Sequence, residues 1–111
     1  MITIDISRDY TKSPGGRKIK EGLYSGEDFR NRILKPKYQE ARENGDNLLV
    51  ILDGGYGYAP SFLEEAFGGL VRDLKDSKIA EISILSEEEP ELVDNIRNYI
   101  ADALKELGNE K

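Results

Sequence analysis

Short apolar runs that alternate with amphipathic stretches constrain the fold of this 111-residue chain more than any other feature. The run ITIDIS at 2–7 alternates apolar and polar side chains, which is typical of a half-buried strand. The run LLVIL at 48–52 is continuously apolar, so we expect a central strand buried on both faces. IAEISIL at 79–85 predicts another strand. RKIKEGLY at 17–24 predicts a weaker strand that pairs back on the first.

The first amphipathic stretch predicts a helix from about 26 to 43. Ser25 is a suitable N-cap, because its hydroxyl can accept from an early backbone N–H. Pro36 lacks the N–H that a helix interior needs, so we expect either a kink or two short helices that meet near Lys35. Asn44-Gly45 ends the helix, since both residues tolerate a left-handed cap.

Two further helices follow the other strands. Apolar side chains recur at spacings of three and four from Phe62 to Leu74, and again from Leu92 to Leu107 after Pro90. Strands that alternate with amphipathic helices indicate an α/β fold. We expect a mixed sheet of about four strands covered by three or more helices, formed by a single domain over residues 1–111.

Composition excludes several classes of function. The chain has no cysteine and no histidine, so it cannot form a disulfide, a zinc–thiolate site or a catalytic triad of the usual kind. The net charge of −6, from 22 acidic and 16 basic residues, repels nucleic-acid phosphates and anionic lipid. The sequence shows no membrane-spanning run and no signal peptide. We therefore expect a cytoplasmic protein that binds neither nucleic acid nor membrane.

The segment DGGYGYAPS at 53–61 lies between a strand and a helix, which is the layout of a phosphate-binding loop. Gly55 and Gly57 match the first two glycines of a dinucleotide fingerprint, but the third position is Pro60. Asp53 would also place a carboxylate close to a bound phosphate, which is unfavourable without a metal. A nucleotide or anion site at this loop is therefore the weaker interpretation.

The same segment has a structural interpretation. Its glycines allow the positive φ angles of a tight turn, while Tyr56 and Tyr58 pack over the sheet edge or contact a partner. Ser61 and Glu64 fit a capping box, and Glu65 fits a solvated helix face. Asp53, Glu64 and Glu65 together suggest a carboxylate site for magnesium, but their sequence spacing does not show that the three side chains converge. We expect no metal and no cofactor.

Two charged clusters fit solvated surfaces. Arg17, Lys18 and Lys20 fit the edge of a hairpin better than a phosphate-binding patch, because Glu21 is adjacent. The acidic run at 87–91 precedes a helix, where negative charge is favourable.

The segment LLVILDGGYGYAPSFLEEAFGGLVRDL resembles the STAS-like domain-of-unknown-function family. That family has an apolar strand ending in Asp, a short loop, Ser-Phe, an acidic pair, and an aromatic-Gly before an apolar helix. The matching residues here are Asp53, Ser61-Phe62, Glu64-Glu65 and Phe67-Gly68. Members of the family are bacterial or phage-borne, and the resemblance implies a fold and a docking surface rather than a reaction.

STAS domains proper include the anti-sigma factor antagonists. In those proteins a serine at the start of the helix after the central strand is phosphorylated by a partner kinase, and the phosphate blocks docking. The residue at the matching location is Ser61, but here a longer glycine–tyrosine loop precedes it and no glycine follows it. The resemblance implies that Ser61 is a regulatory site in addition to a helix cap.

We expect a non-enzymatic regulatory module, a monomer or weak dimer, that binds a protein partner. The resemblance suggests a histidine-kinase-like ATPase or a switch protein. Aromatic residues dominate interface energetics, so Tyr56, Tyr58 and Phe62 are the expected anchors, with Asp53, Ser61 and Glu65 beside them. The alternatives are a small nucleotide- or anion-binding protein or enzyme that uses loop 53–61, and a phage-type inhibitor with an acidic face.

Overall fold

A computed structural model describes residues 1–108 and contains a three-stranded parallel sheet. The strands are β1 (Ile2–Asp5), β2 (Leu48–Ile51) and β3 (Ser83–Leu85), and they lie in the order β1-β2-β3. In register, Ile4 lies opposite Val50, and Val50 lies opposite Ile84. The apolar run at 48–52 therefore forms the central strand, as the sequence predicts.

Helices connect and follow the strands. After β1 come α1 (Ile6–Asp9), a 3-10 helix (Ile19–Glu21), α2 (Gly26–Phe29), a π-helical segment (Arg30–Leu34) and α3 (Lys35–Glu43). After β2 come α4 (Pro60–Leu63), a second π-helical segment (Glu64–Gly68), α5 (Gly69–Leu74) and a 3-10 helix (Ser77–Glu81). After β3 comes α6 (Glu91–Gly108). No helix within residues 1–108 is both long and apolar enough to cross a membrane.

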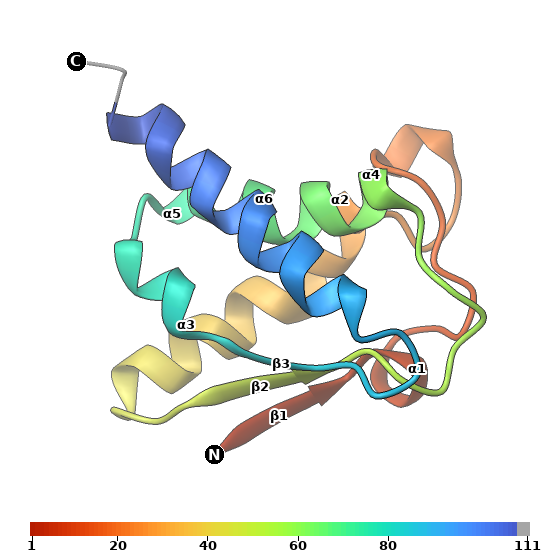
Figure 1. The fold of residues 1–111 in the computed structure, drawn as a ribbon, viewed down its shortest axis with the longest axis horizontal. Coiled ribbons are helices and arrows are strands. Elements are labelled where there is room, and N and C mark those ends of the chain that lie inside the picture. Colours follow the sequence, from red (N-terminus) through yellow and green to blue (C-terminus); the bar gives the residue numbers. More distant parts are fainter. Residues whose placement is uncertain (109–111) are drawn as a thin grey trace.

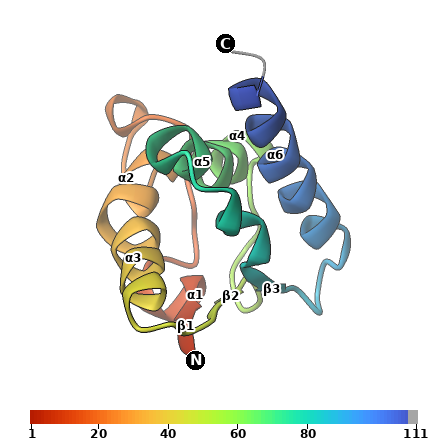
Figure 2. The ribbon, with the colours of Figure 1, turned by 90° about the vertical axis from the view of Figure 1, so that its left-hand side faces the viewer.

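The helices lie on one side of the sheet. In Figure 1 the strands run along the bottom and α2 to α6 lie above them, and Figure 2 shows α3, α5 and α6 side by side over the sheet. The crossover from β1 to β2 and the crossover from β2 to β3 each move to the next strand on the same side. Because such connections are right-handed, the helices of both crossovers lie on the same face of the sheet. Ile4 and Val50 point into this core and are buried, whereas Leu49 and Ile51 point the other way and are half-buried. The prediction that β2 is buried on both faces is therefore wrong.

Residues 17–24 form no strand, which corrects a second prediction. They lie in an irregular segment with one 3-10 turn, and the segment folds on itself through bonds from Gly15 N to Tyr24 O and from Gly26 N to Gly16 O, both 2.9 Å. Gly22 has a φ of 138°, which breaks the extended run. The α/β class and the STAS-like architecture are confirmed, but the sheet has three parallel strands instead of about four mixed ones.

The first helical run covers the predicted range and confirms its ends. Ser25 Oγ accepts from Asp28 N at 3.0 Å, so this serine is the N-cap. Asn44 is the C-cap, and Gly45 has the left-handed φ of 64°. The run continues helically through Pro36 and does not split at Lys35, because the wider π-helical turn just before it accommodates a residue that has no N–H.

The strand predicted at 79–85 is shorter than expected. Its first part belongs to the 3-10 helix Ser77–Glu81, and Asp76 starts that helix by accepting from Lys78 N at 3.0 Å. Only Ser83–Leu85 pairs with β2. Ile79 and Ile82 are nevertheless buried in the core, so their apolar character reflects packing under the helices and not extended backbone.

Candidate functional site

The loop after β2 lies at the end of the sheet where all three strands finish, beside α1 and the loop before α6 (Figure 1). Asp53 accepts from Glu87 N at 3.0 Å and from Glu88 N at 2.9 Å. In return, Gly54 N donates to the Glu88 carboxylate at 2.8 Å. These reciprocal bonds join the loop after β2 to the loop after β3, so Asp53 holds two connections together.

The glycines of the loop are explained by its backbone. Gly54 and Gly57 have φ angles of 93° and 121°, which side-chain-bearing residues rarely adopt. A Cβ at Gly54 would also lie 2.7 Å from Ser7 Oγ. Tyr56 N donates to Lys12 O at 2.8 Å, so the loop also packs on the segment after α1. The N–H groups of Gly54 and Tyr56 are thus already bonded within the domain and are not available to a ligand.

Electrostatics at the loop oppose a phosphate site. Burial raises the pKa of Tyr58, and the nearby carboxylates of Asp5, Asp53, Glu88 and Glu89 raise it further. A phosphate placed among these carboxylates would be repelled. Within residues 1–108, no three carboxylate side chains lie together in an arrangement that could hold a metal ion.

The three aromatic residues expected to be anchors lie in different environments. Tyr56 is 83% exposed. Tyr58 is half-buried, donates its hydroxyl to Leu52 O at 2.9 Å, and has its ring 5.9 Å from that of Phe62. Phe62 is fully buried and stacks on Phe29 at 5.8 Å. Phe62 therefore supports the core, and Tyr56 is the aromatic side chain of the loop that a partner can reach.

Ser61 lies at the second position of its helix, so the predicted capping box is wrong. The N-cap is Ala59, which has no side-chain oxygen to cap the helix, and Pro60 is the first helical residue. Proline pre-sets the helical φ and needs no hydrogen-bond acceptor, so the helix starts two residues earlier than an N-cap at Ser61 would give. The half-buried Ser61 remains on the first turn, close to the loop.

Glu65 is a buried member of an ion cluster and does not lie on a solvated face. Its side chain is 6% exposed, and its carboxylate receives Arg30 Nη1 at 2.7 Å, Arg17 Nη1 at 3.2 Å and Lys18 Nζ at 3.4 Å. Arg30 Nη1 also donates to Glu65 O at 2.6 Å. A Cβ on Gly69 would overlap the Arg30 guanidinium, so this glycine makes room for the pair. We call Arg17, Lys18, Arg30, Glu64, Glu65, Arg72 and Asp73 the ion cluster.

Glu64 extends the ion cluster towards solvent. It accepts Arg72 Nη1 at 2.7 Å and Nη2 at 3.1 Å, and it also binds Arg17. The hydrogen bonds from Arg72 lower the pKa of Glu64 in spite of partial burial, and Arg17 adds to this effect. Arg17 and Lys18 are thus ion-paired to the helix after the loop, which corrects their interpretation as a solvated hairpin edge. Lys20 remains exposed.

The ion cluster includes Arg30, which the sequence did not single out. Its signal is an arginine between Phe29 and Ile33, inside the apolar stripe of the first helical run. A matching signal is Glu65, between Phe62 and Ala66 in the second run. Two opposite charges on two apolar stripes predict a pair across the helix–helix contact, since a charge is buried favourably only with a partner.

Some acidic side chains elsewhere are paired with cations on different elements. Asp9 binds Arg8, Asp46 binds the N-terminal ammonium group, and Asp76 binds Arg42. The carboxylates of Asp5, Asp53, Glu88 and Glu89 instead gather near Tyr58. The inhibitor with an acidic face therefore stays a prediction.

The chain is thus a one-sided, parallel α/β domain whose loops meet at one end of the sheet, with a buried Arg30–Glu65 ion pair between its first two helical runs. Residues 25–91, more than half of the chain, match the family described as the STAS-like domain of unknown function (DUF4325). The chain belongs to this family. No curated protein and no solved structure gave a significant match.

Removing the carboxylate of Asp53 should loosen the loop end without unfolding the domain. We expect Asp53→Ala to lower the free energy of unfolding by about 1–2 kcal/mol, because two backbone N–H groups lose a charged acceptor. Asp53→Asn keeps one acceptor oxygen and should lose about half as much. Urea denaturation of both variants measures this difference, and equal losses would contradict a role based on paired acceptance.

Proposed function

We propose that this domain is a non-enzymatic, cytoplasmic regulatory module that binds a protein partner through the loop at 53–59. The observation that carries the proposal is Tyr56, an aromatic side chain that is 83% exposed on a loop held by hydrogen bonds on both sides. Large aromatic side chains are frequent hot spots of protein interfaces. A large apolar side chain held in solvent on an ordered loop is therefore well suited to contact another protein.

The rigidity of the loop strengthens this proposal. Binding is weakened by the entropy lost when a mobile loop becomes ordered, and this loop is already tied to the segment after α1 and to the loop before α6. Asp53 begins the loop, and Glu88 is hydrogen-bonded to it. Their charge favours a partner with a basic rim around the pocket that would receive Tyr56. The family resemblance suggests a histidine-kinase-like ATPase or a switch protein as that partner.

Regulation at Ser61 is the finer part of the proposal. Ser61 lies on the first helical turn after the loop, so a phosphate there would meet the positive end of the helix dipole. The added charge of about −1.5 to −2 would stand next to the docking loop. A surface that docks onto a neutral hydroxyl would be repelled by that charge, and the domain itself would stay folded.

A quantitative pull-down from the native host lysate tests the proposal. The baits are the wild-type domain, Tyr56→Ala and Ser61→Asp, with Tyr58→Phe as the matched aromatic control, because it keeps the ring of a half-buried tyrosine. We expect a partner that the wild-type domain and the control retain, that Tyr56→Ala loses and that Ser61→Asp releases. All variants should keep the circular dichroism spectrum of the wild type.

Other outcomes separate the parts of the proposal. A partner retained by Ser61→Asp would leave the docking module but remove the switch. A partner retained by Tyr56→Ala would place docking elsewhere on the domain. Calorimetry with ATP, GTP and magnesium completes the test, since saturable heat that depends on loop 53–61 would favour the nucleotide-binding alternative instead.

A further inference from the structure

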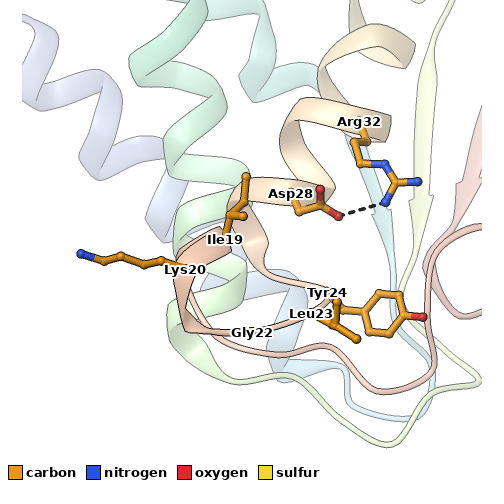
Figure 3. A pocket seen from close by; sticks show the side chains of 7 residues that line it. All are labelled: Ile19, Lys20, Gly22, Leu23, Tyr24, Asp28 and Arg32. Carbon is orange, nitrogen blue, oxygen red and sulfur yellow. Dashed lines mark hydrogen bonds and ion pairs between the residues drawn. The ribbon is translucent and has the colours of Figure 1, made fainter.

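A second surface lies on the segment between α1 and α2, and its pocket is lined by residues other than those of the loop at 53–59. We call residues 10–24 the strap. A pocket of about 510 Å³ is lined by strap residues between Ile19 and Tyr24 and by Asp28 and Arg32 of the following helix (Figure 3). We propose that this strap pocket binds an extended, acidic and apolar peptide segment of a protein partner. The proposal is independent of the function assigned to loop 53–59.

The apolar part of the strap pocket is exposed. Leu23 is 82% exposed, Ile19 53% and Tyr24 42%, while most large apolar side chains within residues 1–108 are packed in or against the core. Figure 3 shows Leu23 and Tyr24 projecting together from the turn that follows Ile19. A cluster of exposed apolar side chains rimmed by polar ones is typical of an interaction site.

The strap holds these side chains in place. Ile19 N donates to the Glu27 carboxylate at 3.0 Å, and Arg17 is held by Glu64 and Glu65 of the ion cluster. Tyr24 has a φ of 61°, which is uncommon for a residue other than glycine. Its ring packs edge-on against Tyr10 at 5.5 Å, which holds it in this conformation. A strained residue that is held in a defined position is frequent at functional sites.

The charges around the strap pocket favour an acidic partner. The Arg32 side chain is 67% exposed, and its only ion pair within residues 1–108 is with Asp28 at 3.3 Å. Asp28 Oδ2 also accepts from Tyr10 OH at 2.6 Å and keeps its charge, so the lining of the pocket carries two cations, Lys20 and Arg32, against one carboxylate. Glu21 Oε1 accepts from Arg17 N. Within residues 1–108, only Nη1 of the Arg32 guanidinium is bonded, so its other nitrogens keep donors for a carboxylate of the partner.

Lys20 supplies a second cation at the other side of the pocket. It makes no ion pair with any residue in the described range 1–108, and Figure 3 shows its side chain extending away from Arg32. The two cations thus flank the apolar side chains. This spacing fits an extended segment, in which apolar residues contact Leu23 and carboxylates before and after them reach the two cations.

The test uses two acetylated peptides as probes, Glu-Leu-Glu-Phe-Glu and its charge-swapped equivalent Lys-Leu-Lys-Phe-Lys. Amide NMR shifts of the wild-type domain should move saturably at residues 19–24 and 28–32 with the acidic peptide. The acidic peptide should bind about tenfold more tightly than the basic one. Arg32→Glu should remove or reverse this preference, and Leu23→Ser should weaken the binding of both peptides.

Controls separate this proposal from the proposed function. Tyr56→Ala should bind the acidic peptide as the wild type does, because Tyr56 does not line the strap pocket and the substitution keeps the backbone bond from residue 56 to Lys12. Leu23→Ser and Arg32→Glu alter exposed side chains, and circular dichroism melting checks that both variants stay folded. Equal affinity for both peptides, shifts outside the strap pocket, or no saturable shift would overturn the proposal. Sedimentation of the wild type as a dimer and of Leu23→Ser as a monomer would instead identify a second copy as the occupant.

Discussion

Arg30→Met should lower the free energy of unfolding by about 3 kcal/mol, because it leaves the buried Glu65 carboxylate without its closest cation. We expect a loss near the lower end of the usual range for a broken buried pair, since Arg17 and Lys18 still contact the same carboxylate. Urea denaturation monitored by circular dichroism measures the loss.

The double variant Arg30→Met/Glu65→Leu is the matched control. Replacing both members of a buried ion pair by apolar residues of similar size is often close to neutral, so the double variant should be more stable than Arg30→Met alone. The loss of stability in the double variant is compared with the sum of the losses in Arg30→Met and Glu65→Leu. If it equals that sum, the two side chains are not coupled and the central role of the ion cluster is wrong.

Acid titration gives an independent readout of the same pair. Burial by itself raises the pKa of Glu65, but hydrogen bonds from Arg30 and Arg17 and the positive charges nearby outweigh it, so the net pKa lies below the usual 4.5. A lowered pKa in the folded state stabilises the fold above the unfolded pKa, and this stability is lost as the pH falls through the folded value. The wild type should therefore lose more stability below pH 4.5 than the double variant.

Phe62→Ala should cost about 3–5 kcal/mol, because it removes a fully buried aromatic ring from the centre of the core. The ring contacts Phe29 and Tyr58, which belong to different elements, so its loss opens a cavity among them. For a domain of this size such a loss is a large part of a total stability of about 5–15 kcal/mol. Thermal unfolding should show a markedly lower midpoint.

Tyr56→Ala is the control for this experiment, since it removes an aromatic ring of similar size that lies in solvent. Its unfolding midpoint should stay within the error of the wild type. Loss of partner binding with an unchanged midpoint would identify Tyr56 as an interface residue, whereas loss of binding in Phe62→Ala reports only on folding. A stable Phe62→Ala variant would contradict the packing described for this residue.

The sequence predicts those parts of the fold that depend on local patterns. The alternation of ITIDIS, the run LLVIL, the Ser25 cap and the Asn44-Gly45 end are each encoded within a few neighbouring residues. Each is found in the structure, although the strand predicted at 2–7 ends at Asp5 and its last two residues begin α1. The strand expected at 17–24 is absent, because nothing in its short alternation requires a sheet partner. The exposure of one face of β2 depends on the hand and direction of the crossovers, which an apolar run cannot specify.

The candidate site was less accessible to sequence reasoning. Tyr56, Tyr58 and Phe62 look alike in the sequence, and only their three-dimensional positions separate a solvent-facing ring from a core ring. Glu65 follows another glutamate on an amphipathic helix, so the sequence predicts a solvated side chain. In the structure the facing helical run places Arg30 against it, and both side chains are buried. A single charge on an apolar stripe indicates that the side chain needs a partner, but the residue that supplies this partner becomes visible only when both helices are placed.

The two π-helical segments, Arg30–Leu34 and Glu64–Gly68, pack against each other and contain the two halves of the buried ion pair. A π-helical turn holds one residue more than an α-helical turn, so it corresponds to a single-residue insertion in a regular helix. The residues after such an insertion are rotated about the helix axis relative to those before it. We therefore expect a relative with regular helices to align with a one-residue gap at each of the two segments. In a relative that has a gap at only one segment, the rotation would separate Arg30 from Glu65, so we expect one or both of these charges to be replaced.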